Sequence, residues 1–527
     1  MNKTRLATLT FAIIFAFIVI ISRLFYWQII KSGELRKDSL LQSYKIEVIN
    51  PPRGSILASD NFPLAQNQTF YQLSIYKPNL NKPISDVFNI INNIKPTFIT
   101  NNQSMVNRLT NDSNLKWYTF PDYFSYEDSQ QLNLPGLTFT SITQRYYPEN
   151  DLAKSIIGGL ERYYNKQLVG KAGFFRLSKD ALGNALLLNS NWQTQAVPGQ
   201  DLHLYLNRPL QYLTETILKD GVTKFQADSG SITIMDPKTG GILAMSSFSA
   251  TSSATPSAEA DPIITRLFEP GSIFKPLVMA AALDTHVIDI NYTCPRCAAP
   301  LPIGQYTITN WNNELHPNTN LADIIKNSDN IGMSNIIAVL GQDKFLSYYK
   351  RLGLNQKSGI DLVGEAKPVL KKNWSPIDLA TASFGQGIAI TQLQMLTAFT
   401  TLADDGYLIK PKMVDDSRPI NKIKIYDSTT VREIKNILKY AVNNGVVAKF
   451  KPIDMEVCAK SGTAQIPLNG TYSPDNTIAS YIGFSPCDNP KFSMIVTIDN
   501  PRTSPWGSST AAPIWYDLAQ KISNSPL

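Results

Sequence analysis

The sequence predicts a chain of α/β (α+β) class, with a mainly antiparallel sheet packed by helices in its C-terminal part. Three observations lead to this prediction. A nearly unbroken apolar run covers residues 6–27. Alternating segments and Pro- and Asn-rich stretches then continue to about residue 225. Beyond that point, strand-like segments enclose a region whose apolar residues recur at helical spacing.

The composition is that of a folded chain of two to four domains. It has 527 residues, of which 43% are hydrophobic and 17% charged. The net charge of +7 favours anionic lipid headgroups or cell-wall polymers as partners. We find no basic helix, zinc-finger spacing or aromatic RNA motif, so we expect no nucleic-acid partner.

The apolar run is long enough to cross a bilayer as one helix. Tyr26 and Trp27 at its end resemble an interfacial aromatic belt, and Lys3 and Arg5 favour a cytoplasmic N-terminus. A cleaved signal peptide is the alternative, but the run is long for one and no Ala-x-Ala-like site closes it. We therefore expect a single-pass anchor in the cell (inner) membrane, with the bulk of the chain outside the cytoplasm.

Four parts are predicted along the chain. They are a cytoplasmic tail at 1–5, a transmembrane helix at 6–27, an elongated mixed pedestal domain at 28–225, and a catalytic domain at 226–527. In the pedestal, strands are expected at 44–48 and 69–75, and a helix from residue 160. In the last part, strands are expected at 231–236, 241–245, 455–459, 477–484 and 492–498, and helices at 321–326, 333–340, 391–403 and 431–441.

Ser272 and Lys275 are the first candidate catalytic pair. They lie three residues apart after Pro270-Gly271, so on a helix they share one face. A free serine is a weak nucleophile and needs a base, and burial lowers the pKa of a lysine enough for it to serve. A helix that starts near Ser272 also aims free backbone N–H groups at developing negative charge.

Ser-x-x-Lys alone is weak evidence, since Ser113–Lys116 repeats it. The order of the motifs strengthens it. Ser328-Asp329-Asn330 follows Ser272 by 56 residues, and Lys460-Ser461-Gly462-Thr463 follows Ser328 by 132. Serine-x-x-lysine, Ser-x-Asn and Lys-[Ser/Thr]-Gly in this order form the signature of penicillin-interacting serine acyltransferases.

With these motifs the chain resembles the class B penicillin-binding proteins, the peptidoglycan D,D-transpeptidases. The resemblance extends to the N-terminal part through Arg53-Gly54-Ser55-Ile56 and Gly159-Leu160-Glu161, and to Gly385-Gln386-Gly387. It implies the penicillin-binding transpeptidase fold. The opening Glu269-Pro270-Gly271-Ser272 favours the division-type (septal) branch over the elongation type. The second motif departs from the more usual Ser-Ser-Asn but keeps its reactive groups.

The resemblance implies roles for each candidate. Ser272 is expected to attack the penultimate D-alanine of a stem peptide, with Lys275 as base, Ser328 as proton relay and Asn330 as a substrate and lysine contact. Lys460 is expected to hold a positive potential. The substrate-binding residues are expected to be Ser461, Gly462 and Thr463. Backbone N–H groups of Ser272 and Thr463 are expected to form the oxyanion hole. The chemistry requires no metal and no organic cofactor.

The same resemblance implies partners: peptidoglycan stem peptides, β-lactams as covalent inhibitors, and a polytopic glycosyltransferase that polymerises lipid-linked disaccharide, with other division or elongation membrane proteins. Two alternatives stay open. A membrane-anchored serine β-lactamase or β-lactam sensor uses the same motifs, but we find no residue that activates water for deacylation. The second alternative is a non-catalytic cell-wall scaffold, but this hypothesis does not explain why three intact motifs are present.

Four cysteines are present. Cys294 and Cys297 favour a small disulfide in an oxidising compartment. A zinc site with His286 or His316 and a pair of unpaired thiols are the alternatives. Cys458 is expected to pack as a small buried strand residue.

Overall fold

A computed structural model describes residues 3–179, 185–250, 261–468 and 471–524. Two residues of the expected cytoplasmic tail, Met1 and Asn2, lie outside this part. The chain divides into two compact units, which are Met1–Gly54 with Lys166–Gln200 and Ser55–Asn165 with Asp201–Leu527. The expected pedestal at 28–225 therefore contributes to both units, and its boundaries stay a prediction.

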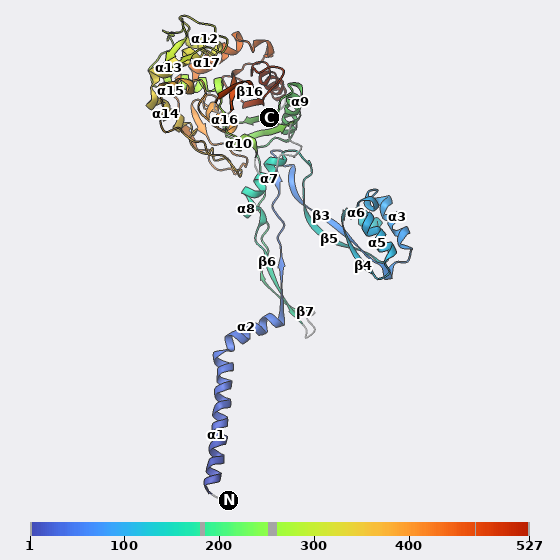
Figure 1. The fold of residues 1–527 in the computed structure, drawn as a ribbon. Coiled ribbons are helices and arrows are strands. Elements are labelled where there is room, and N and C mark those ends of the chain that lie inside the picture. Colours follow the sequence, from blue (N-terminus) through green and yellow to red (C-terminus); the bar gives the residue numbers. More distant parts are fainter. Residues whose placement is uncertain (1–2, 180–184, 251–260, 469–470, 525–527) are drawn as a thin grey trace. The chain divides into compact units, whose positions relative to one another are not determined.

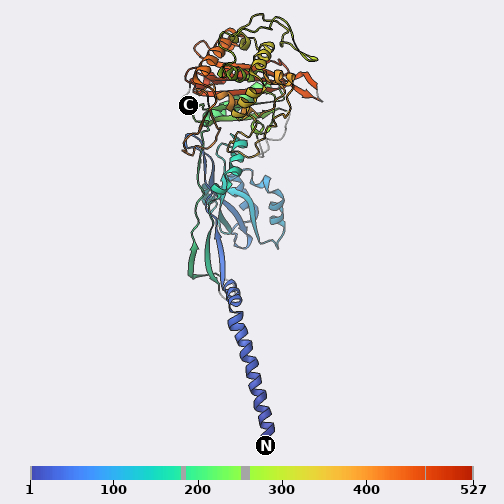
Figure 2. The ribbon, with the colours of Figure 1, turned by 90° about the vertical axis from the view of Figure 1, so that its left-hand side faces the viewer.

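The first unit joins a long helix to a small antiparallel sheet of order β1-β6-β7. Helix α1 is one long rod (Figures 1 and 2). A span over Thr4–Ile30, with a mean hydropathy of 2.4, is long and apolar enough to cross a membrane. The elements are α1 (Lys3–Phe25), a π-helical turn (Tyr26–Ile30), α2 (Ser32–Ser43), β1 (Tyr44–Ile49), α8 (Asn165–Val169, across the unit boundary), β6 (Gly173–Lys179) and β7 (Ala185–Thr194).

The second unit begins with a sheet of order β4-β3-β2-β8, on which β5 also pairs with β3. Helices close one side over a core rich in phenylalanine, including Phe88, Phe98, Phe120 and Phe124. The strands are β2 (Ile56–Leu57), β3 (Pro63–Tyr76), β4 (Trp117–Phe124), β5 (Leu137–Tyr146) and β8 (Leu202–His203). The helices are η2 (Lys77–Asn79), α3 (Ile84–Ile94), α4 (Phe98–Asn101), α5 (Gln103–Asn111), α6 (Tyr126–Gln131) and α7 (Lys154–Tyr163).

A second five-stranded sheet of this unit is fully antiparallel, with the order β10-β9-β17-β16-β15. Its green and red strands run side by side in Figure 2. The strands are β9 (Ser229–Met235), β10 (Ile242–Ser249), β15 (Cys458–Leu468), β16 (Thr471–Ser485) and β17 (Phe492–Asp499). Strand β15, which carries Lys460 to Thr463, lies at the edge of this sheet and pairs with β16.

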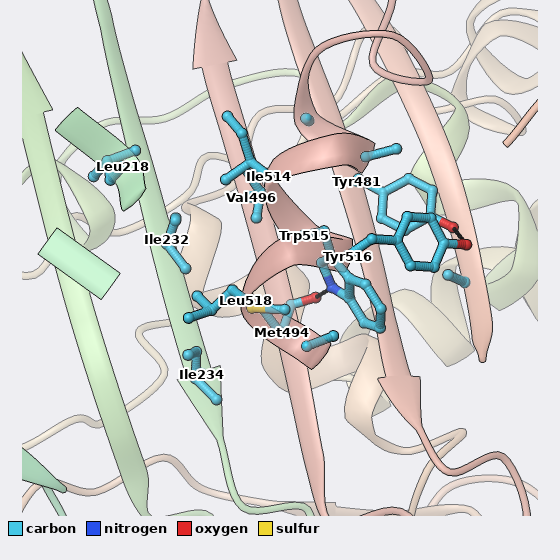
Figure 3. Close-up of a cluster of buried hydrophobic side chains, with 14 of the residues drawn as sticks. Leu218, Ile232, Ile234, Tyr481, Met494, Val496, Ile514, Trp515, Tyr516 and Leu518 are labelled. Atoms are coloured by element: carbon cyan, nitrogen blue, oxygen red, sulfur yellow. Dashed lines mark hydrogen bonds between the residues drawn. The ribbon is translucent and has the colours of Figure 1, made fainter. Parts of the chain in front are cut away.

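Helices cover this sheet on both faces. On one face α9 and α18 bury a continuous apolar core, in which Trp515 donates its indole N–H to Met494 O at 3.0 Å and Tyr481 bonds Tyr516 at 2.6 Å (Figure 3). On the other face Gln392 of α16 bonds Thr233 at 2.9 Å. Alternate residues of β9 thus face different helices.

The remaining elements lie between the strands in sequence, except α18, which follows β17. The helices are α9 (Arg208–Lys224), α10 (Pro262–Thr265), η3 (Gly271–Phe274), α11 (Lys275–Asp284), α12 (Leu321–Lys326), α13 (Asn330–Leu340), α14 (Gln342–Arg351), α15 (Pro376–Ala382), α16 (Gln392–Thr400), α17 (Ser428–Asn444), η4 (Ala448–Phe450) and α18 (Ala511–Ser523). Two small hairpins pair β11 (Leu301–Ile303) with β12 (Tyr306–Ile308) and β13 (Tyr407–Ile409) with β14 (Lys422–Lys424).

The predicted elements match this architecture, but several of their bounds differ. Helix α7 begins at Lys154 rather than at residue 160, and strand β16 begins at Thr471 rather than at residue 477. The structure places the first closing strand at Cys458–Leu468, whereas the sequence predicted 455–459. The prediction was wrong because the polar residues Lys460 and Ser461 break the apolar alternation. The strand continues because its backbone pairs with β16, whatever the side chains are.

All four cysteines form disulfides. Cys294 is bonded to Cys297, which confirms the favoured prediction and excludes the zinc and free-thiol alternatives for this pair. Cys458 is buried on a strand as predicted, but it is not a lone packing residue, since it is bonded to Cys487. The sequence could not show this pair because 29 residues separate its members and only the β15–β16 hairpin brings them together.

Candidate active site

Ser272 lies in a tight turn that leads into a buried helix. The turn, η3, is a 3₁₀-helix, and the α-helix α11 starts three residues after Ser272, at Lys275. Gly271 opens the turn in the left-handed region, with φ of +60°. Ser272 is partly exposed, whereas Ile273, Phe274 and Lys275 are buried. Ser272 is thus the more exposed residue of a well-packed element.

The Lys275 amine is held by three hydrogen bonds. Its Nζ donates to Ser328 O at 2.5 Å, to Ser328 Oγ at 3.1 Å and to Asn330 Oδ1 at 2.8 Å. Among the described residues, the structure records no hydrogen bond between Lys275 Nζ and Ser272 Oγ. The lysine therefore joins the first motif to the second through its side chain.

The charge of Lys275 is disfavoured where it sits. Burial, followed by the nearby charge of Lys460, lowers the pKa of Lys275 well below its usual value, against a smaller opposite effect of Asp329. The side chain is fully buried. A neutral amine with a free lone pair is a base, so the site can accept a proton.

The Ser-Asp-Asn motif forms the connection between α12 and α13. Ser328 has a φ of +54°, and this left-handed residue turns both its carbonyl and its hydroxyl toward Lys275. Asp329 is fully buried and caps α13, because its Oδ1 accepts the N–H of Gly332 at 2.7 Å. The geometry of this loop thus comes from one strained residue and one helix cap.

The third motif lies on β15 against the nucleophile turn. A Cβ atom at Gly462 would lie 2.9 Å from Ile273 Cγ2 and 3.1 Å from Ile273 N, so only glycine allows this approach. Thr463 Oγ1 accepts the N–H of Gly507 at 3.1 Å. Burial lowers the pKa of Lys460 to about 7, and its Nζ donates to Ser461 O at 2.8 Å. The structure therefore brings all three motifs together, from three separate elements.

Several residues around the motifs were not found from the sequence. Asn310 Oδ1 accepts the N–H of Asn330 at 2.8 Å, and Trp311 donates its indole N–H to Asn327 O at 3.2 Å. His316 Nδ1 lies 2.7 Å from Asp329 Oδ2. The rings of Trp311 and Trp506 contact each other with centroids 4.9 Å apart. Asn310, Trp311 and His316 lie in a loop without periodicity, so no sequence signal marked them as neighbours of the motif.

No metal site is evident in this region. Within residues 3–179, 185–250, 261–468 and 471–524, no group of three or more His, Cys, Asp or Glu side chains is placed to bind a metal ion.

Comparison with known families agrees with this geometry. The model of the penicillin binding protein transpeptidase domain matches residues 230–520, more than half of the chain. The chain belongs to this family. The penicillin-binding protein dimerisation domain matches residues 48–159 in addition. The predicted class and its family resemblance are thereby confirmed.

Proteins of known name are similar to this chain over most of its length. The peptidoglycan D,D-transpeptidase FtsI of Escherichia coli (strain K12) is 26% identical over 97% of this chain and 90% of its own length. The probable peptidoglycan D,D-transpeptidase PenA of Neisseria gonorrhoeae is 30% identical over 71% of this chain and 67% of its own. The crystal structure of penicillin binding protein 2X from Streptococcus thermophilus has the same fold, with a TM-score of 0.74 at 21% identity, and covers 91% of this chain and 80% of that one.

Proposed function

We propose that this chain is a membrane-anchored peptidoglycan D,D-transpeptidase that cross-links stem peptides through an acyl-enzyme on Ser272, the serine that β-lactams also acylate. The observation that carries the proposal is the state of Lys275. Its amine is fully buried, its pKa is well below the usual value, and it lies three residues from a partly exposed serine. This is the environment of a general base beside a nucleophile.

The reaction starts with the attack of Ser272 Oγ on the carbonyl carbon of the penultimate D-alanine, while Lys275 Nζ takes the hydroxyl proton. The backbone N–H groups of Ser272 and Thr463 stabilise the oxyanion, each contributing about 3 to 4 kcal/mol as in other enzymes. The peptide bond then breaks, and the proton reaches the leaving D-alanine through Ser328, whose Oγ is 3.1 Å from Lys275 Nζ. An amine from a second stem peptide attacks the ester and restores the serine.

The third motif binds the substrate in this proposal. Ser461 and Thr463 hold the terminal carboxylate, and Lys460 complements its charge. Gly462 lets the strand approach the nucleophile turn closely enough for this contact. Asn330 bonds both the substrate backbone and Lys275, the latter at 2.8 Å in the structure.

The setting follows from the N-terminal helix and the relatives. We place the chain in the inner (cytoplasmic) membrane through Thr4–Ile30, with its catalytic domain on the periplasmic or extracellular side. The Glu269-Pro270-Gly271-Ser272 opening and relatives named FtsI favour a role in cell division. A polytopic glycosyltransferase that polymerises lipid-linked disaccharide is the expected partner, since a cross-linking enzyme needs newly made glycan strands.

Covalent labelling tests the proposal. Incubating the full chain in detergent with a fluorescent penicillin should give an adduct on the Ser272 peptide that lasts for hours. Ser272→Ala should abolish the label, whereas Ser113→Ala, in the second Ser-x-x-Lys sequence, should leave it unchanged. A label that survives Ser272→Ala contradicts the assignment. Rapid release of hydrolysed drug supports a β-lactamase instead, and a wild-type chain that takes no label supports a scaffold.

A further inference from the structure

The Ser-Asp-Asn loop is held from outside by a segment that the three motifs do not include. Four residues of the segment 309–316 contact the loop or Asn327, the residue before it. Asn330 donates its side-chain N–H to Thr309 O at 3.1 Å, and Asn310, Trp311 and His316 supply the other contacts. Asn310 is buried and its Oδ1 accepts two backbone N–H groups, those of Asn330 and Ile331. The loop therefore depends on side chains of this segment for its position.

The contact between His316 and Asp329 differs from the others because it involves a buried charge. Asp329 is fully buried, and its two oxygens have separate partners: Oδ1 accepts the N–H of Gly332, and Oδ2 lies 2.7 Å from His316 Nδ1. A carboxylate only accepts hydrogen bonds, so Nδ1 is the donor. A buried carboxylate needs such partners to remain charged.

The segment that carries His316 is itself fixed to the first disulfide. The backbone N–H of His316 donates to Cys297 O at 3.2 Å, and that of Cys294 donates to Thr319 O at 2.9 Å. Cys294 and Cys297 are both buried. The backbone of His316 is thus bound to a covalently closed loop, and its imidazole contacts Asp329.

Asp329 stands between the two residues that bind the Lys275 amine. Ser328 and Asn330 make all three hydrogen bonds to Lys275 Nζ, and Asp329 links them in the chain. Its negative charge also acts on the lysine, because Asp329 raises the pKa of Lys275 against the lowering effects of burial and of Lys460. Glu314, largely exposed, is the other acidic group near the imidazole, with Oε2 3.8 Å from His316 Nε2.

We propose that His316 and Asp329 are positioning residues of this site: the imidazole fixes the Asp329 carboxylate, which holds Ser328 and Asn330 on the Lys275 amine and supplies negative charge to it. This inference rests on the proposed role of Lys275 as the base. It adds a residue, His316, that lies outside the three motifs and acts through Asp329.

The first test removes the imidazole. His316→Leu should slow acylation by a fluorescent penicillin about 10- to 100-fold, since a small displacement of a catalytic group has effects of this size. His316→Asn should restore most of the rate, because its side-chain N–H can take the place of Nδ1. His286→Asn is the matched control and should leave the rate unchanged, because His286 is exposed and already has a φ of +53°.

The second test measures the effect of the negative charge of Asp329. Asp329→Asn keeps an acceptor for the Gly332 N–H but removes the negative charge. Because that charge raises the pKa of Lys275, the acid limb of the acylation–pH profile should move to lower pH. A purely structural role of Asp329 predicts a lower rate with no movement of this limb. Circular dichroism of each variant separates misfolding from a local effect, and His316→Asn and Asp329→Asn keep the test decisive if His316→Leu does not fold.

Three results overturn the inference. The first is a His316→Leu variant that acylates as fast as the wild type. The second is an Asp329→Asn variant whose acid limb does not move. The third is a wild-type chain whose acylation is slowed by a chelator and restored by added zinc, which would make His316 a metal ligand instead. A failure of the proposed function looks different. If the proposed function is wrong, the same labelling experiments show either a wild-type chain that takes no label or a Ser272→Ala variant that keeps the label.

Discussion

The two sides of the candidate site are built in different ways. One side, here called the loop wall, consists of Ser328–Asn330 and residues 309–316, and side chains hold it in place. The other, the strand wall, is Lys460–Thr463 on β15, and its position comes from backbone pairing with β16. Each wall is next to a disulfide, Cys294–Cys297 at the loop wall and Cys458–Cys487 at the strand wall.

This difference predicts how each wall tolerates substitution. A loop fixed by side chains fails when one donor or acceptor is lost, because a buried partner is then left unsatisfied. A strand fixed by its backbone keeps its course under most side-chain changes. It fails when added bulk prevents its close approach to a neighbour, as at Gly462.

The largest effect on the strand wall is expected for Gly462→Ala. The added methyl group would lie 2.9 Å from Ile273 Cγ2, so either the strand or the nucleophile turn must shift. We expect acylation by penicillin to slow about 100-fold, with little change in secondary structure. Gly33→Ala is the matched control, since nothing lies within 4 Å of its added atom. A Gly462→Ala chain that acylates at the wild-type rate contradicts the close packing described here.

The pH dependence compares the lysines of the two walls. Lys275 must be neutral to take a proton, so the acylation rate should rise with pH through its lowered pKa. Lys460 must be charged to attract a carboxylate, so the rate should fall again as pH passes its pKa of about 7. A bell-shaped profile is therefore expected.

Lys460→Arg sharpens this prediction, because a guanidinium stays charged throughout the range. The variant should lose the alkaline limb and keep the acid limb. An unchanged alkaline limb would assign that limb to another group.

The smallest effect on acylation is expected from the disulfides. Replacing Cys458 and Cys487 by alanine opens a loop with a separation of 29 residues and should lower the free energy of unfolding by about 3 to 4 kcal/mol. The Cys294/Cys297 double alanine variant opens a separation of 3 and should cost about half as much. Thermal unfolding of the full chain in detergent measures both, and acylation of the Cys458/Cys487 variant should stay within about threefold because backbone pairing keeps β15 in place.

Much of the fold could be predicted from the sequence. The apolar run before residue 27, the β9–β10 hairpin and α12 are local features, in which hydrophobic periodicity and turn residues act over a few positions. The end of β15 was misplaced at residue 459 because the residues that follow are polar, and the Cys458–Cys487 pair was missed because it depends on a hairpin. Both errors concern contacts between residues that lie far apart in sequence.

For the site, the sequence by itself determined which residues are candidates, since the order of three short motifs singled out Ser272, Lys275, Ser328, Asn330 and Lys460 to Thr463 from their repeats elsewhere. The family resemblance also implied that Asn330 contacts Lys275. Only the tertiary structure decided that the Lys275 amine is bound by Ser328 as well, and that His316 and Asn310 hold that loop. The physical reason is that burial and hydrogen bonding are properties of the folded chain. A lysine is an ordinary cation in the sequence, and it becomes a base when the packed protein removes the water around it.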